Sequence, residues 1–97
     1  MSFVQIVELR TSNPDKLIAL EREWEQATDG ERTARRRILT RDRNRPDRYL
    51  EIVFFDSYES AQENSNLAAT RDFAERFTAL VDGPVDFHDL DVISDQT

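Results

Sequence analysis

Runs of apolar residues alternate with polar segments along this chain, and the period of the apolar positions changes from one run to the next. Residues 3–10 and 49–55 are short and rich in β-branched and aromatic side chains, which is typical of strands. Residues 32–40 form a weaker strand candidate because arginines interrupt them. The polar turn at 41–48 contains a proline and predicts a hairpin. Residues 85–93 alternate apolar and polar side chains, which predicts a last strand.

Two further segments carry apolar residues at helical spacing. The first begins with Asn13 as N-cap and Pro14 at the first helical position, and Gly30 is expected to close it. Its expected apolar stripe is Leu17, Leu20, Trp24 and Ala27. Polar residues are expected on its other side, namely Glu21, Arg22, Glu23 and Glu25.

The second helical segment is expected to break in its middle. Asp56 or Ser57 caps its start, and helical spacing resumes over residues 71–80 before the "DGP" stop at 82–84. Between them, "NSN" at 64–66 predicts an interruption, because Ser and Asn side chains bond to nearby backbone and compete with the helix.

Two interpretations of this interruption remain open. In the first, Ser65 or Asn66 caps the second helical piece. In the second, Asn64 or Asn66 turns its amide into a neighbouring cleft and holds a polar group of a ligand.

The predicted order of elements is β-α-β-β-α-β, which is the ferredoxin-like motif of the α+β class. We expect residues 1–97 to form a single domain, with a four-stranded antiparallel sheet and both helices on one face.

Neither face of the predicted sheet is polar. Helices cover only one face of such a sheet, so an apolar second face would stay in water. This exposure costs about 25 cal/mol of free energy per Å² of apolar surface. We therefore expect a homodimer in which two sheet faces pair with C2 symmetry; a monomer with a few exposed apolar residues is the alternative. In the third strand the two sets of side chains are Leu50, Ile52 and Phe54 on one face, and Tyr49, Glu51, Val53 and Phe55 on the other.

Composition narrows the class of protein. The chain has no cysteine and one histidine, so we expect no disulfide, no metal site and no cofactor. No basic segment followed by a long apolar run opens the sequence, so we expect a cytoplasmic protein without membrane contact. The net charge of −7 argues against nucleic acid as a partner.

Charge is unevenly placed, because residues 31–48 hold eight arginines against three acidic residues. Arginine binds carboxylates and phosphates through paired hydrogen bonds. One interpretation pairs these arginines with the chain's own acids, for instance Glu51 on the neighbouring strand. Another gives Arg37 an anionic small ligand. A nucleic-acid site is the weakest interpretation, since no aromatic RNA-binding strand is present.

The order of elements, together with "RYLEIVFFDSYESAQENSNLAATRDFAERFTALVDGPVDFHDLDVI", resembles the antibiotic-biosynthesis-monooxygenase-like domains of the dimeric α/β-barrel superfamily. An aromatic strand, an acidic helix with alanine, a short break, a second helical piece with Phe, a proline turn and a last strand follow one another. The resemblance covers nearly the whole chain, and it is a pattern of elements without a catalytic signature. It implies a dimeric α/β barrel with a cleft between the sheet and a bent second helix.

The family includes cofactor-free oxygenases of polyketide quinols and haem-degrading enzymes. The haem-degrading members resemble one another in an Asn on the first strand and a Trp and a His around the second helix. This chain departs at each place, with Gln5 on the first strand, Trp24 on the first helix and His88 on the last strand. Haem degradation is therefore not carried over.

Three aromatic or titratable residues are candidates for a site. His88 has the only side chain whose ordinary pKa lies near neutrality, which makes it the candidate catalytic acid or base, with a packed histidine as the alternative. Trp24 has core spacing, or it lines the cleft and stacks on a flat ligand. Tyr58 offers a phenol donor, or it is a half-buried aromatic at an element end.

Two functions are consistent with the sequence. One is a small enzyme that oxidises or rearranges an aromatic or polyketide-like compound without a metal, which needs a base and a dry pocket. The other is a non-catalytic ligand-binding or regulatory homodimer. Asn64, Asn66, Trp24, Arg37 and Tyr58 are the expected ligand-binding residues, with His88 as the expected catalytic one.

Overall fold

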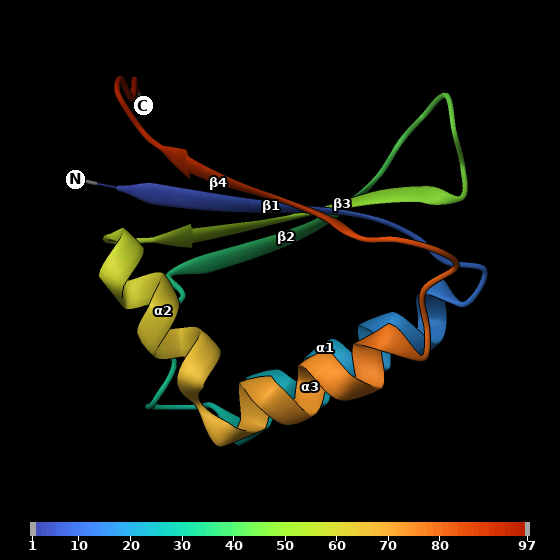
Figure 1. Cartoon of the computed structure of the whole chain (residues 1–97), viewed down its shortest axis with the longest axis horizontal. Helices are drawn as coiled ribbons and strands as arrows, with labels where there is room; N and C mark the ends of the chain where they lie inside the picture. Colours follow the sequence, from blue (N-terminus) through green and yellow to red (C-terminus); the bar gives the residue numbers. More distant parts are fainter. Residues whose placement is uncertain (1, 97) are drawn as a thin grey trace.

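A four-stranded antiparallel sheet with helices along one face makes up the computed structural model, which describes residues 2–96 (Figure 1). The elements are β1 (Phe3–Arg10), α1 (Pro14–Ala27), β2 (Arg36–Arg41), β3 (Arg48–Phe55), α2 (Tyr58–Asn66), α3 (Ala68–Thr78) and β4 (Asp86–Asp91). The strands lie in the order β2-β3-β1-β4. This arrangement confirms the ferredoxin-like fold, with the second helix divided into two parts.

The strand register decides which side chains face the helices. Val7 of β1 lies opposite Glu51 of β3 and Phe87 of β4, whereas Ile6 lies opposite Ile52 and His88. Because neighbouring residues of a strand point to opposite faces, these two sets separate. The helix-facing set forms the buried core of the sheet, namely Phe3, Val7, Leu9, Tyr49, Val53 and Phe55. The opposite side, called the open face below, carries half-buried or exposed apolar residues, namely Val4, Ile6, Ile38, Ile52, Phe54 and Leu90.

Helix α1 begins where the sequence predicted, but the bonds at its start differ. Asn13 is the N-cap without a side-chain capping bond. The hydroxyl oxygen of Thr11 instead accepts from the Asn13 amide at 3.0 Å and donates to the Leu80 carbonyl at 2.6 Å. Gly30 does not close the helix, which ends at Ala27 with Thr28 as C-cap. Gly30 lies in the following turn at φ +81°, a conformation that favours glycine.

The break in the second helical segment lies at Leu67, one residue beyond the predicted "NSN". Asn64 to Asn66 form the last turn of α2 and do not interrupt it. Leu67 leaves the helix with ψ 138°, and its carbonyl accepts from the amides of Thr70 and Arg71 at 3.0 Å. The prediction that Ser65 or Asn66 caps the second piece is wrong, because α3 starts without a side-chain cap.

The other end of α2 and the start of β2 are linked. Ser57, one of the two predicted capping residues, is the N-cap, and its hydroxyl accepts from the Ser60 amide at 3.0 Å. Strand β2 starts only at Arg36, later than predicted, because the preceding residues pack on α2. Thr33 donates from its amide to Asn64 and from its hydroxyl to the Ser60 carbonyl, so this part of the chain cannot extend the strand.

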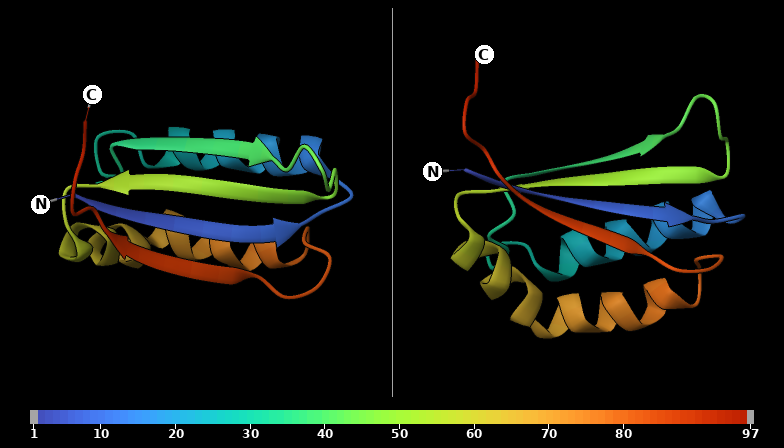
Figure 2. Two further views of the ribbon diagram at one scale, coloured as in Figure 1. Left: turned by 90° about the horizontal axis from the view of Figure 1, so that it is seen from above. Right: turned by 45° about the horizontal axis from the view of Figure 1, so that its top comes forward.

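The helices form one layer beneath the sheet (Figure 2). Helix α1 lies under the β2 side of the sheet, and α2 and α3 lie under the β4 side. The β2–β3 hairpin and the segment after β4 both rise on the open face, away from the helices (Figure 1). Among residues 2–96, no helix has the length and apolar character needed to cross a membrane.

Leu17 and Ile18 offer a matched test of this packing, since Leu17 is 0% exposed and its neighbour Ile18 is 38% exposed. We expect Leu17→Ala to lower the free energy of unfolding by about 2–5 kcal/mol, because a buried leucine leaves a cavity. Ile18→Ala should change it by about 0.5 kcal/mol or less. Urea unfolding followed by circular dichroism measures both; equal losses would contradict the assigned helix face.

Candidate functional site

A cleft of 270 Å³ lies between the helix-facing side of the sheet and the three helices. All four strands and all three helices contribute to its lining. Apolar ligand clefts of this kind are the usual sites of small-molecule binding. Its wall is mainly apolar and contains five aromatic side chains, namely Trp24, Phe55, Phe73, Phe77 and Phe87.

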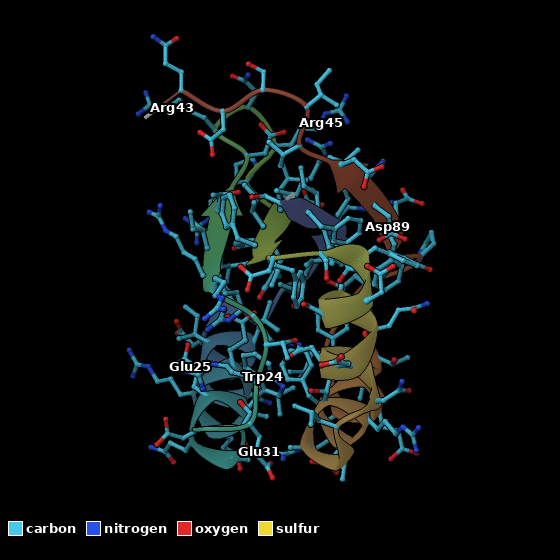
Figure 3. The ribbon with its side chains drawn as sticks, turned by 90° about the vertical axis from the view of Figure 1, so that its left-hand side faces the viewer. Trp24, Glu25, Glu31, Arg43, Arg45 and Asp89 are labelled. Carbon is cyan, nitrogen blue, oxygen red and sulfur yellow. The ribbon has the colours of Figure 1, made fainter. Side chains whose placement is uncertain are left out.

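Trp24 joins α1 to α3 across one wall of the cleft (Figure 3). Its indole N–H donates to the hydroxyl oxygen of Thr70 at 2.9 Å, and its ring lies 6.3 Å from that of Phe73. Phe73 stacks on Phe77 at 5.7 Å, which continues the aromatic surface along α3. This surface suits a flat apolar ligand, because aromatic rings pair favourably with planar π-systems.

The floor of the cleft is an ion cluster around the Arg37 guanidinium. Its Nη1 donates to Glu21 Oε1 at 2.6 Å and to Glu51 Oε1 at 3.1 Å, and its Nη2 donates to Glu25. The guanidinium also lies 6.0 Å from the Trp24 ring centre. The cluster confirms the interpretation that an arginine of this segment pairs with Glu51, and it places Arg37 in the cleft lining as well.

Glu51 is a buried carboxyl group within this cluster. Burial, followed by the neighbouring Glu21 carboxylate, raises the pKa of Glu51 to about 9, against the lowering effect of Arg37. Burial disfavours the charged form, and a like charge nearby disfavours it further. Glu51 is therefore mostly a neutral carboxylic acid at pH 7.

Two polar atoms of the floor lack a hydrogen-bond partner within residues 2–96. They are Glu21 Oε2 and Arg37 Nε, and both are buried. Buried polar atoms are rarely left unpaired, since the loss costs about 1–3 kcal/mol each. Glu21 Oε2 is therefore free to accept from a further donor, and Arg37 Nε is free to donate to a further acceptor.

Asn64 lines the cleft from the last turn of α2. Its side chain is buried, and its Oδ1 accepts from the Thr33 amide at 3.2 Å. That bond uses the Asn64 carbonyl oxygen, and its NH₂ group remains a potential donor. Of the two asparagines in the "NSN" stretch, Asn64 lines the cleft and Asn66 does not.

The structure brings together only some of the predicted site residues. Trp24, Arg37 and Asn64 share the cleft. Tyr58 and Asn66 lie outside it, in a second, more open hollow beside α2. This hollow adjoins the cleft, because Gln5 and Ser65 line both.

His88, the expected catalytic residue, lies on the open face of the sheet and not in the cleft lining. The alternation of β4 turns Asp89, not His88, toward the helices, where Gln5 donates to it at 3.1 Å. His88 Nε2 lies 3.2 Å from Glu8 Oε1, and Glu8 also pairs with Arg48 at 2.9 Å.

Sequence reasoning missed Glu21, which was expected on the polar side of α1. The signal is present, because Glu21 falls between Leu20 and Trp24 in the buried i, i+3, i+4, i+7 stripe that starts at Leu17. A charged residue at such a position needs a buried partner, which is Arg37 here.

Comparisons with known proteins identify the fold. No protein-family model matches the chain, and no curated protein matches its sequence. An asparagine-to-alanine variant of SnoaB, a cofactor-independent oxygenase from Streptomyces nogalater, superposes with a TM-score of 0.81 at 10% identity, covering 97% of this chain and 95% of that one. The fold is that of the antibiotic biosynthesis monooxygenases.

Two further solved structures are similar over the full length. An antibiotic biosynthesis monooxygenase matches with a TM-score of 0.75 at 15% identity, over 97% of this chain and 100% of that one. Rv0793 from Mycobacterium tuberculosis matches with a TM-score of 0.81 at 14% identity, over 100% of both chains. The expected resemblance is thereby confirmed at the level of the fold.

The raised pKa of Glu51 predicts how stability depends on pH. Folded Glu51 keeps its proton up to about pH 9, whereas an unfolded glutamate loses it near 4.5. Between these values the folded state binds more protons, so the free energy of unfolding falls as pH rises, on the order of 1 kcal/mol per pH unit from this group. Glu51→Gln should flatten this slope, measured by urea unfolding from pH 5 to pH 9 at intervals of about one unit.

Glu25→Gln is the matched control for that series, because Glu25 binds the same guanidinium from a half-exposed position. It should leave most of the slope in place. A wild-type slope that Glu51→Gln does not change would contradict the buried neutral carboxyl.

Proposed function

We propose that this protein is a monooxygenase-like enzyme that takes a planar aromatic or polyketide-like compound into the cleft and oxidises or rearranges it without a metal or organic cofactor. The observation that supports this most strongly is the aromatic cleft with a polar floor. SnoaB, a cofactor-independent oxygenase with the same fold, is a precedent for such chemistry.

The dimensions and lining of the cleft favour a small flat ligand. A cavity of about 150 Å³ lined by apolar residues holds one benzene ring. The cleft of 270 Å³ therefore suits about two fused rings. Such a ring system would lie against Trp24 and Phe73, with its polar substituents toward Arg37 and Glu51 or toward the NH₂ group of Asn64.

An alternative is a non-catalytic ligand-binding or regulatory protein. The position of the only histidine supports it, because His88 lies on the open face and gives the cleft no group that titrates near neutral pH by default. Oxygen uptake distinguishes the two functions: with 1,4-dihydroxynaphthalene, an enzyme raises the rate above the uncatalysed oxidation, whereas a binding protein does not.

We also propose a homodimer formed by two open faces. These faces carry apolar side chains from all four strands, which would gain free energy on leaving water. The β2–β3 hairpin and the segment after β4 rise at opposite ends of this face and leave the space between them for a second sheet (Figure 1). A self-complementary face of this kind fits C2 pairing.

Ligand binding can be followed through Trp24, the only tryptophan of the chain. We expect 2-naphthol to quench its fluorescence, because the ring would lie in van der Waals contact with the indole. Phe73→Ala should weaken binding about tenfold, which corresponds to the loss of one aromatic contact. The dissociation constants come from fluorescence titration at pH 7.

The control variant is Tyr58→Phe, which removes a hydroxyl outside the cleft and should leave the dissociation constant unchanged. Saturable quenching that is insensitive to Phe73→Ala would place the ligand elsewhere. No quenching by 2-naphthol at millimolar concentration would count against a site for aromatic compounds.

The dimer is tested with a charge on the open face. Ile52→Glu should convert the protein to monomers, because a buried carboxylate at the centre of paired sheets is strongly unfavourable. Ile18→Glu places the same charge on the exposed side of α1 and should not change the mass. Native mass spectrometry measures both; a wild-type protein of single-chain mass would refute the paired sheets.

A further inference from the structure

We propose that Glu21 and Glu51 hold one shared proton at the floor of the cleft and exchange it with the hydroxyl group of a phenol- or enol-bearing ligand. The pair would thus be the proton donor and acceptor of the site. This inference rests on the proposed function, because it names the class of compound that the cleft takes.

The geometry of the pair supports a shared proton. One nitrogen, Arg37 Nη1, donates to an oxygen of each carboxyl group, which holds the two groups side by side. Glu21 is only 3% exposed, and its second oxygen has no donor within residues 2–96. A proton on Glu51 supplies that donor, because a carboxylic acid donates to a neighbouring carboxylate. The otherwise unpaired oxygen and the crowded charges are then explained together.

The charges around the pair are unbalanced without this proton. Glu21 and Glu25 of α1 and Glu51 of β3 all converge on the guanidinium of Arg37 from β2. One positive charge therefore faces three carboxyl groups. From α3, Arg71 lies at the exposed mouth of the cleft and donates to Asn66 at 3.3 Å, so it does not neutralise the floor. A proton on Glu51 reduces the excess negative charge by one.

The pKa of Glu51 is close to that of a weakly acidic hydroxyl group. Phenols lose their proton near pH 10, and burial raises the pKa of Glu51 to about 9. Transfer between two groups of similar pKa is nearly balanced in free energy, which suits an acid or base catalyst. In the transfer the Glu51 O–H bond breaks, its electron pair stays on the carboxylate, and the proton forms an O–H bond on the oxygen of a phenolate or enolate ligand. The reverse transfer returns it.

The orientation of a ligand follows from this assignment. Its hydroxyl group would point toward the carboxyl pair, and its rings would lie between the sheet and the Trp24–Phe73 wall. A flat compound without a hydroxyl group could fill the same volume, but it would make no contact with the proton. Naphthalene and 2-naphthol therefore form a matched pair of probes.

The shared proton can be measured in the free protein by infrared difference spectroscopy, where a protonated carboxyl group has its own carbonyl band. We expect such a band at pH 7, with a midpoint of loss near pH 9. Glu51→Gln should remove it. Glu21→Gln should move the midpoint to lower pH, because the adjacent negative charge is gone. Glu25→Gln, one turn away and outside the cleft lining, should leave the band in place at pH 7. Absence of the band in the wild-type protein at pH 7 would overturn the proposal without any variant.

The same infrared carbonyl band reports contact between a ligand and the carboxyl pair. Adding 2-naphthol at pH 7 should shift it, because the carboxyl proton then bonds to the naphthol oxygen, while naphthalene should leave it unmoved. Binding of 2-naphthol that quenches Trp24 without shifting the band would overturn the proton exchange and leave the binding function standing. Failure of both probes to bind would instead remove the proposed function, and the proton exchange with it, whereas the titration of the free protein would still decide the pair.

Discussion

The Arg37 guanidinium is the contact on which the cleft depends. It extends from β2 and binds two carboxylates of α1 and one carboxyl group of β3. Withdrawing a guanidinium from water costs free energy unless its charge is paired, and these ion pairs tie α1 to the sheet.

Helix α3 explains why the other side of the cleft stays open. None of its residues is fully buried, and Phe73 and Phe77 face the cavity with half-buried rings. The helix is held at its side by the Trp24–Thr70 hydrogen bond and at its end by contacts of Leu80 and its neighbours with the core below β1. The break at Leu67 lets α2 pack on β3 while α3 turns away beneath the β4 side of the sheet (Figures 1 and 2). The cleft is the space left between these two supports.

Much of this arrangement could be predicted from the spacing of apolar residues and from the residues that start and end helices and strands. Strands with dense apolar residues and the capping residue Ser57 follow from local rules. An interruption of the second helical segment was predicted, but not its exact place at Leu67, because α3 starts without a side-chain cap and leaves no local signal. Glu21 was assigned to the polar side of α1 because it is acidic, although its position falls in the apolar stripe. Its burial depends on the ion pair with Arg37, which is distant in sequence.

His88 shows a different limit of sequence reasoning. The alternation predicted for residues 85–93 is present, and it puts His88 on the same face as Leu90 and opposite to Asp89. What the sequence lacks is the identity of the face that the helices cover, which only the register with β1 decides. The position of Asn64 was equally hard to predict, because the Thr33 amide that bonds to its side chain is far away in sequence.

The crystal structure of the protein with bound 2-naphthol tests the central claim most directly, because it locates the ligand and its hydroxyl group together. The account predicts rings against Trp24 and Phe73 with the hydroxyl oxygen within hydrogen-bond distance of Glu21 or Glu51. A naphthol with its hydroxyl group toward the solvent at the mouth of the cleft, or bound on the open face of the sheet, would contradict it.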